Sequence, residues 1–254
     1  MNSILKYIFL TAVRDWLYVG LFMMLIAAFG VSVMLGSTAL VEEQQMSVVY
    51  IAGSSRMILA IGIILFICFH IRRSFDNKEV EFILSKAISR HKFIFAYLSG
   101  FILVSVIILL PVIIALFFSP TNKVGLIYWS LSIFFELLII ATFCILASLI
   151  LKSAVSAVLA ALGFYILSRM MALFVFTAKI PQDVKDISTI NLFLKSLLKI
   201  ISAIFPRLDL FAKSDWLIYG VTSFSDITII ITQSIIYIPL LIFMSFYDFS
   251  KKQF

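Results

Sequence analysis

Long apolar runs separated by short polar segments dominate the chain. Six of these runs are long enough to cross a bilayer, which takes about 20 apolar residues in a helix. They cover residues 17–41, 48–71, 93–118, 126–151, 153–178 and 227–247. The runs are too long for strands and lack the alternation of apolar and polar positions that strands show. The pattern predicts an all-α integral membrane protein with six transmembrane helices in one domain, residues 1–254.

Two amphipathic segments lie outside these runs. Residues 2–16 place charged side chains among apolar ones and end in Trp16, a pattern typical of a helix at the membrane interface. Residues 190–205 carry polar side chains along one helical face, and Pro206 follows. We expect the second segment to form an amphipathic helix on the outer leaflet or over the ends of the spans.

A third amphipathic segment connects the second and third runs. Asp76 is followed three residues later by Glu79, which is the spacing of an N-cap and its capping box. Apolar side chains then recur with helical spacing at Val80, Ile83, Leu84, Ala87 and Ile88. Acidic residues come first and basic residues last, which suits the helix dipole. The pattern predicts a short helix over residues 76–90.

The composition supports the membrane class. Hydrophobic residues make up 63% of the chain and charged residues 13%, against about 25% charged in soluble domains. So much apolar surface has to face lipid. The net charge of +7 then indicates membrane topology and contact with lipid headgroups rather than nucleic acid. Cys68 and Cys144 lie in apolar runs, where we expect small buried side chains and no disulfide.

The distribution of charge predicts the orientation of the chain. The connection between the second and third runs contains six basic residues, Arg72, Arg73, Lys78, Lys86, Arg90 and Lys92. The connection before the second run contains Glu42 and Glu43 instead. Basic connections stay in the cytosol, so both termini are expected on the cytosolic side. The membrane itself is expected to be the cytoplasmic (inner) membrane of a bacterium. Residues 179–226 would lie outside, and their six basic residues are nearly balanced by five aspartates.

Three ionisable residues fall within the predicted spans: Arg56, Glu136 and Arg169. An arginine at the centre of a membrane helix costs about 2.5–3.5 kcal/mol on insertion scales. The predicted orientation places all three in the outer half of the membrane, where one carboxylate can pair with two guanidinium groups. Contact between helices is the favoured interpretation of this charge cluster; a substrate path, or arginines that reach the outer surface, are the alternatives.

Motifs of catalysis and metal binding are missing from the sequence. It contains no H-E-x-x-H, no G-x-S-x-G and no C-x-x-C. His70 and His91 flank the segment between the second and third runs without other ligands at metal-like spacing, so we expect solvated side chains at the interface. We therefore predict no metal site and no cofactor in this chain.

The segment after the second run resembles a family motif. It reads Ile83-Leu84-Ser85-Lys86-Ala87-Ile88-Ser89-Arg90 after an acidic residue, and the third run follows at once. This resembles the permeases of export-type ATP-binding cassette transporters of the second class, where an acidic residue leads into Leu-Leu-Ser-x-Pro-Ile-Ser-Arg. The chain departs at Ala87, where the family often has proline, and at Val80, where glycine is common. The six runs, the interfacial N-terminal segment and the length are similar too, and 205-FPRLDLF-211 resembles a segment of the branch linked to copper-enzyme maturation.

The resemblance implies that residues 76–90 form a coupling helix that docks in a cleft on a separate ATPase subunit. The residues it assigns to coupling are Asp76, Glu79, Val80, Glu81, Phe82, Ile83, Leu84, Ser85, Ile88 and Arg90. ATP and magnesium would bind to the partner, because no glycine in this chain is followed by lysine and the G-x-x-x-x-G-K-[ST] loop is missing. The chain is therefore not expected to be an enzyme. A second permease copy, identical or related, would complete the pathway.

The sequence leaves alternatives open for the binding mode of residues 76–90 and for the function of the chain. A helix over 76–90 fits either the anionic surface of the inner leaflet or a groove on a soluble partner. In function, a permease of an ATP-driven exporter stands beside a non-transporting scaffold that recruits an ATPase or transmits its force. An intramembrane enzyme is least favoured, since no catalytic constellation is present. The scarcity of polar groups in the spans favours a lipid-like or amphipathic cargo.

Overall fold

The computed structural model describes residues 11, 16–38, 43–85, 89–179, 196, 200, 204–221 and 224–251. Every regular element in these ranges is a helix. Five helices are long and apolar enough to cross a membrane. They are α2 (Trp16–Thr38), α3 (Glu43–Asp76), α5 (Arg90–Phe118), α6 (Lys123–Ile150) and α11 (Phe224–Lys251). The predicted all-α class is confirmed, and five of the six apolar runs form helices fit to span a membrane.

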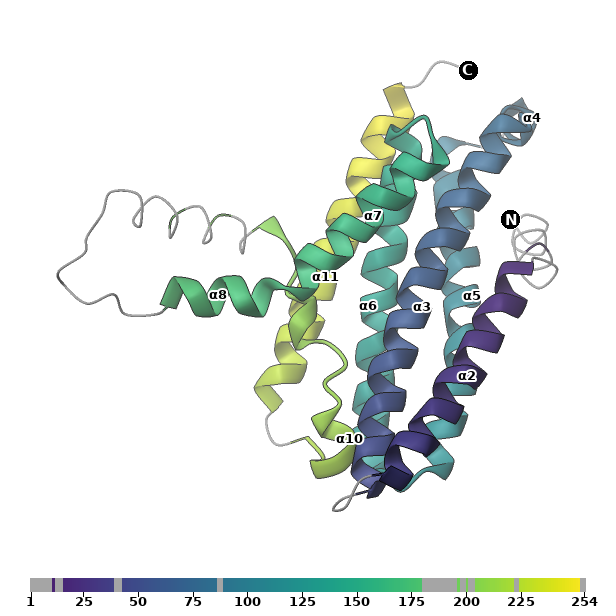
Figure 1. Cartoon of the computed structure of the whole chain (residues 1–254). Helices are drawn as coiled ribbons and strands as arrows, with labels where there is room; N and C mark the ends of the chain where they lie inside the picture. Colours follow the sequence, from purple (N-terminus) through teal and green to yellow (C-terminus); the bar gives the residue numbers. More distant parts are fainter. Residues whose placement is uncertain are drawn as a thin grey trace.

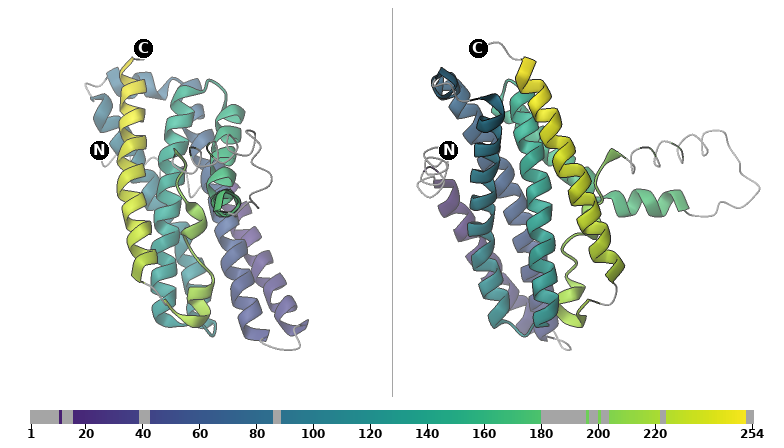
Figure 2. Two further views of the ribbon diagram at one scale, coloured as in Figure 1. Left: turned by 90° about the vertical axis from the view of Figure 1, so that its left-hand side faces the viewer. Right: turned by 180° about the vertical axis from the view of Figure 1, so that it is seen from behind.

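The five long helices lie side by side in one bundle (Figures 1 and 2). Helix α6 packs against α3, α5 and α11 and is the most buried of the five, whereas α2 packs mainly on α3. Helices α2 and α11 leave most of their apolar side chains exposed. Apolar side chains on the outside of a bundle suit a lipid environment, because lipid accepts such surface without cost.

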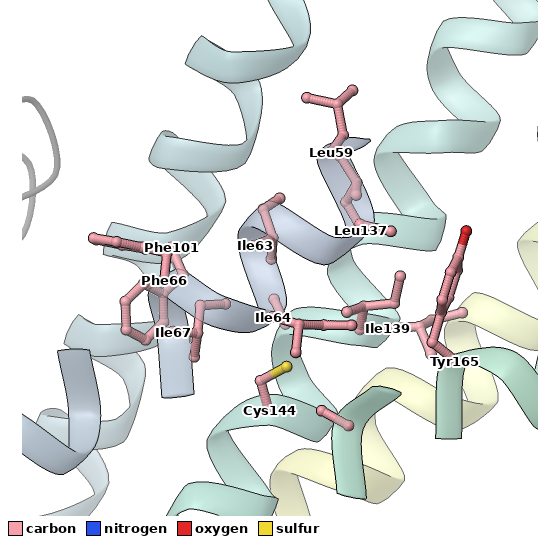
Figure 3. Packing of buried hydrophobic residues seen from close by; sticks show 14 of the residues in the cluster. Leu59, Ile63, Ile64, Phe66, Ile67, Phe101, Leu137, Ile139, Cys144 and Tyr165 are labelled. Carbon is pink, nitrogen blue, oxygen red and sulfur yellow. The ribbon is translucent and has the colours of Figure 1, made fainter. Parts of the chain in front are cut away.

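The core lies where α3, α5 and α6 meet (Figure 3). On α3 the buried side chains recur at helical spacing, as at Leu59, Ile63 and Phe66, and they pack toward Phe101 of α5 and Leu137 of α6. Such interdigitated apolar contacts hold helices together through dispersion. The core fixes the long helices relative to one another, and the candidate sites lie at its ends and edges.

The run over 153–178 does not form one continuous helix. It is divided into α7 (Ala154–Arg169) and α8 (Met171–Lys179), which meet at Met170. Figure 1 shows α8 leaving the direction of α7 and running away from the bundle. The 16 residues of α7 reach about 24 Å, less than the hydrocarbon thickness of about 30 Å. The sixth predicted span is therefore not confirmed.

The connection between α3 and α5 differs from the predicted helix over 76–90. Asp76 is the last residue of α3, and its carboxylate pairs with Arg72 at 3.2 Å, so it does not cap a following helix. A turn with Lys78 at φ 59° leads into α4 (Glu79–Ser85), whose first carbonyl acceptor is that of Lys78. Ser89 is extended and precedes α5. Residues 86–88 lie outside the described residues, and so do most of the segments 2–16 and 190–205.

Candidate functional site

The chain after α8 returns to the bundle as an irregular segment, residues 205–221. It contains the 3-10 helix η1 (Leu208–Leu210) and the short helix α10 (Asp215–Tyr219). Three of its apolar side chains, those of Leu208, Phe211 and Leu217, are fully buried in the common core. Irregular backbone carries carbonyl and amide groups without helical partners, so side chains of the surrounding helices have to satisfy them.

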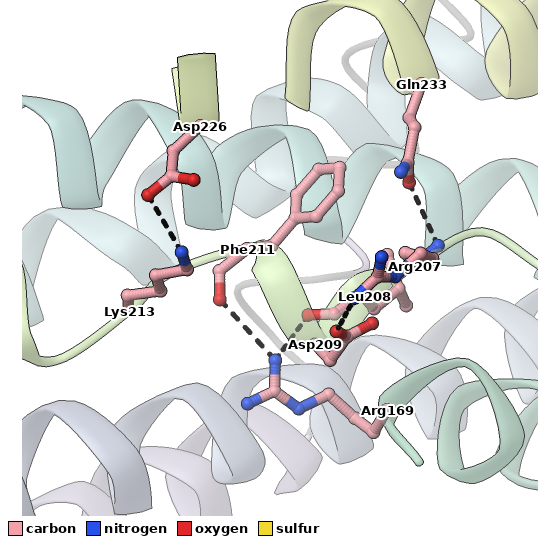
Figure 4. Close-up of polar contacts among 8 residues, drawn as sticks. All are labelled: Arg169, Arg207, Leu208, Asp209, Phe211, Lys213, Asp226 and Gln233. Atoms are coloured by element: carbon pink, nitrogen blue, oxygen red, sulfur yellow. Dashed lines mark hydrogen bonds and ion pairs between the residues drawn. The ribbon is translucent and has the colours of Figure 1, made fainter. Parts of the chain in front are cut away.

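Two of the predicted membrane arginines bind carbonyl groups of this segment. Arg169, the last residue of α7, donates Nη1–H to the carbonyls of Leu208 and Phe211 (Figure 4). Arg56 of α3 donates Nη1–H to the carbonyl of Ala212 at 2.9 Å and to that of Phe211 at 3.4 Å. Both guanidinium groups therefore share the Phe211 carbonyl and fasten residues 208–212 to α3 and α7.

Helices α6 and α11 hold the same segment from the other side. The Ser132 hydroxyl of α6 accepts the Ala212 N–H at 2.8 Å. The Gln233 side chain of α11 accepts the Arg207 N–H at 2.9 Å (Figure 4). Ala212 has φ 46°, a left-handed conformation that costs energy for a residue with a Cβ. Bonds to both its N–H and its carbonyl stabilise that conformation.

Two ion pairs flank the segment. Arg207 pairs with Asp209 at 2.8 Å within the segment, and Lys213 pairs with Asp226 at the start of α11, also at 2.8 Å (Figure 4). Farther along, the Asn122 N–H at the start of α6 donates to the carbonyl of Leu217 at 2.7 Å. These contacts join the segment to three long helices along its whole course.

Glu136 completes the predicted charge cluster in part. Its side chain is fully buried on α6 and interacts electrostatically with Arg56 and Arg169. In the described part of the chain, however, ion pairs within 4.0 Å join only Arg72 with Asp76, Arg207 with Asp209 and Lys213 with Asp226. The structure thus brings the three residues together without the expected direct ion pair, because the guanidinium groups bind backbone carbonyls instead.

A pocket of about 260 Å³ lies between α3 and α7 beside this cluster. Its polar lining comes from Arg56, Tyr165 and Arg169. Its apolar lining comes from Gly53, Met57, Ile166 and Met170. The arrangement combines two cationic groups, a phenol and apolar side chains, and such a set suits an anion that carries an apolar part.

The second candidate site is α4. Phe82 is 62% exposed, and Glu81 and Ser85 are exposed as well. Val80, by contrast, is 1% exposed and belongs to the core of this chain, so it does not offer a surface to a partner. The side chains of Ile83, Leu84 and Arg90, and the whole of Ile88, lie outside the described residues.

Basic side chains surround α4 at one end of the bundle. Figure 1 places α4, the connection between α6 and α7, and the end of α11 at the same end. The exposed bases there are Arg73, Lys78, Lys92, Lys152 and Lys251. This grouping is the three-dimensional counterpart of the charge pattern that predicts a cytosolic side.

Two further predictions concern histidine and cysteine. His70 is buried among Phe66, Tyr97 and Phe101, so its predicted solvated position is wrong. His91 is exposed. Cys68 and Cys144 are buried and free, as expected. Within the described ranges, no three His, Cys, Asp or Glu side chains gather closely enough to hold a metal ion.

Sequence reasoning missed the partners of the arginines. Ser132 and Gln233 are single polar residues in apolar helices and carry no motif. The sequence predicts that residues 205–212 lie in an outer loop, because they fall between two apolar runs. Only the fold shows that some of their side chains are buried. The one local feature of the sequence that indicates an ordered, packed segment here is Pro206 with the alternating apolar residues that follow it.

No protein-family model matches the chain, and comparison with curated proteins finds no similar sequence. The functional interpretation therefore stands on the residues and their geometry.

Proposed function

We propose that the chain is the permease subunit of an ATP-binding cassette exporter of the second class. The observation that supports this most is α4, a short helix between two long helices at the basic end of the bundle, with Glu81 and Phe82 exposed. In this proposal α4 and the residues up to Arg90 form the coupling helix. A separate ATPase subunit binds ATP and magnesium and receives α4 in a groove.

The length of α3 supports a position of α4 outside the bilayer. Its 34 residues extend over about 51 Å, whereas a bilayer with its headgroups is about 40–45 Å thick. A large aromatic side chain on a short helix in water is the kind of group that enters a groove on a partner. The grouped bases support the proposal that this end lies in the cytosol, together with both termini.

Contacts at the base of α4 provide a route for force. The Tyr97 hydroxyl of α5 bonds to the Ser74 hydroxyl of α3 at 3.3 Å. Arg72 of α3 donates to the carbonyl of Leu151, where α6 ends. Val80 anchors α4 in the same core. A displacement of α4 would therefore move the inner ends of three long helices together, as rigid-body switching requires.

The proposal includes a complete transport unit. In this proposal residues 153–178 still supply the sixth crossing of the membrane, and α7 (Ala154–Arg169) is the part of it that packs in the bundle. A second permease copy, identical or related, stands across the pathway. The scaffold alternative differs in one property: its ATPase partner binds and hydrolyses ATP, but no cargo moves.

Replacement of Phe82 by aspartate tests the docking role. We expect Phe82→Asp in the full-length tagged protein to reduce the co-purified ATPase subunit at least tenfold, because a buried aromatic anchor contributes about 2 kcal/mol or more to an interface. The ATPase is identified by mass spectrometry through its G-x-x-x-x-G-K-[ST] peptide and by ATP hydrolysis of the complex.

Phe118 provides the matched control. It is 82% exposed at the opposite end of α5, so Phe118→Asp makes the same chemical change away from α4. This variant should retain the ATPase at the wild-type level. Equal retention by Phe82→Asp and Phe118→Asp would contradict the proposed coupling helix.

A further inference from the structure

The charged groups at the pocket between α3 and α7 have an excess of positive charge, which favours a bound anion. Two guanidinium groups, those of Arg56 and Arg169, line it. Among the described residues, the carboxylate that interacts with them is that of Glu136, which does not line the pocket and forms no direct ion pair with either arginine. One positive charge is therefore left without a counterion in a site largely removed from water.

The hydrogen bonds of the arginines leave donors available. The Nη1 groups of Arg56 and Arg169 donate to neutral backbone carbonyls of residues 208–212. Nε of Arg56 is buried without a hydrogen-bond partner. Tyr165 lines the same pocket with its phenol. Guanidinium N–H groups in a fixed fork match the geometry of the oxygens of phosphate and carboxylate groups.

The rim of the pocket is apolar. Met57, Ile166 and Met170 line it and are 57%, 52% and 41% exposed on the outside of the bundle. In a membrane this surface faces lipid. Arg56 lies 13 residues from the Glu43 end of α3, which places the cationic part of the pocket about 20 Å along that helix. A ligand that enters past these side chains comes from the bilayer and brings an apolar part with it.

We propose that this pocket binds the anionic headgroup of an acyl-chain amphiphile, with a phosphate or carboxylate oxygen at Arg56 and Arg169 and the acyl chain passing Met57 and Ile166 into the lipid. Binding at this pocket requires no ATPase partner. This proposal can therefore be tested separately from the exporter proposal. If the chain is an exporter, the bound amphiphile is its class of cargo or of regulatory lipid.

Native mass spectrometry of the purified full-length chain in detergent measures this binding. The probes are dioleoyl phosphatidylglycerol, oleate, dioleoyl phosphatidylcholine and inorganic phosphate. We expect the first two to bind about tenfold more tightly than phosphatidylcholine, because choline cancels the charge of the phosphodiester and leaves the excess positive charge of the pocket uncompensated. Equal affinity for phosphatidylglycerol and phosphatidylcholine would overturn the proposal. Inorganic phosphate that binds as tightly as phosphatidylglycerol would overturn the requirement for an acyl chain.

Variants separate the pocket from the stability of the fold. Arg56→Gln and Arg169→Gln should abolish the preference for anionic lipids, with retained folding checked by thermal unfolding. Ile166→Trp fills the rim and leaves both arginines with their carbonyl partners, so it should lower the affinity for phosphatidylglycerol about tenfold without unfolding the chain. Lys123→Gln, which removes an exposed cation outside this pocket, should change nothing. An unchanged affinity for phosphatidylglycerol in Ile166→Trp would overturn the proposal even if both glutamine variants fail to fold.

Discussion

At the scale of single residues, the membrane arginines act on backbone carbonyls. Arg56 and Arg169 meet at the Phe211 carbonyl, in a segment whose irregular backbone lies inside the bundle. In hydrocarbon such carbonyls cannot turn to water, so a guanidinium group is a suitable partner. The cost of two partly buried cations is offset by these bonds and by the nearby charge of Glu136.

Close packing at the start of α6 leads to a prediction about Gly125. A Cβ at this position would overlap the carbonyl oxygen of Trp216, so Gly125→Ala forces the segment 205–221 away from α6. We expect a loss of about 1–3 kcal/mol in the free energy of unfolding, measured by denaturant titration in detergent. Gly163→Ala on α7 is the control, because its Cβ would meet no atom within 4 Å. Equal stability of the two variants would show that the segment does not pack on α6.

Two single residues, His70 and Asp76, also have contacts that differ from those their sequence neighbours predict. His70 looks like an interface residue next to two arginines, but the turn of α3 directs it among aromatic rings. Asp76 has the spacing of a cap, but it is the last residue of α3 and pairs with Arg72 one turn earlier. In both places a contact along the same helix, four residues apart, outweighs the local signal.

At the scale of elements, the long helices are predictable and the breaks are not. The ends of a long apolar run mark the ends of the helix it forms. The limits of α5 and α6 accordingly fall within three residues of their predicted limits. The break at Met170 is different, since the residues on both sides are apolar. At this break Arg169 donates to the carbonyls of Leu208 and Phe211, which lie far along the chain. Such a tertiary contact leaves no periodic signal in the sequence.

The turn between α3 and α4 carries a testable strain. Lys78 has φ 59°, where a side chain costs about 1–2 kcal/mol and glycine does not. We expect Lys78→Gly to stabilise α4, seen as slower hydrogen exchange of the amides of residues 79–85. Asn77→Gly in the same turn removes no such strain and should speed exchange through chain entropy. Faster exchange in Lys78→Gly than in wild type would contradict this account of the turn.

At the scale of the whole molecule, the fold separates two candidate sites by position. The basic end carries α4, and the charge cluster with its pocket lies on the flank between α3 and α7. The apolar core of α3, α5 and α6 joins them as one packed body (Figure 3). A packed core transmits displacement without continuous deformation, which suits a subunit that converts docking at one end into rearrangement elsewhere.

The orientation of the molecule is testable with single cysteines. Lys152→Cys and Lys251→Cys lie at the basic end, and Pro120→Cys lies at the other end; all three positions are exposed. An impermeant maleimide added to intact cells should label Pro120→Cys alone, because the proposed orientation directs the basic end to the cytosol. Native Cys68 and Cys144 are buried and should give no background. Labelling of Lys152→Cys with Pro120→Cys protected would invert the orientation.

The most direct test of the coupling role is a photocrosslink from α4 in the cell. Benzoylphenylalanine in place of Phe82 should crosslink to a protein that contains the G-x-x-x-x-G-K-[ST] loop, and the same group in place of Phe118 should not. The account predicts that this crosslink forms in intact cells and changes in yield when ATP is depleted, since closure of the ATPase moves the groove. Crosslinks from position 82 to lipid alone would contradict it and would place α4 on the membrane surface.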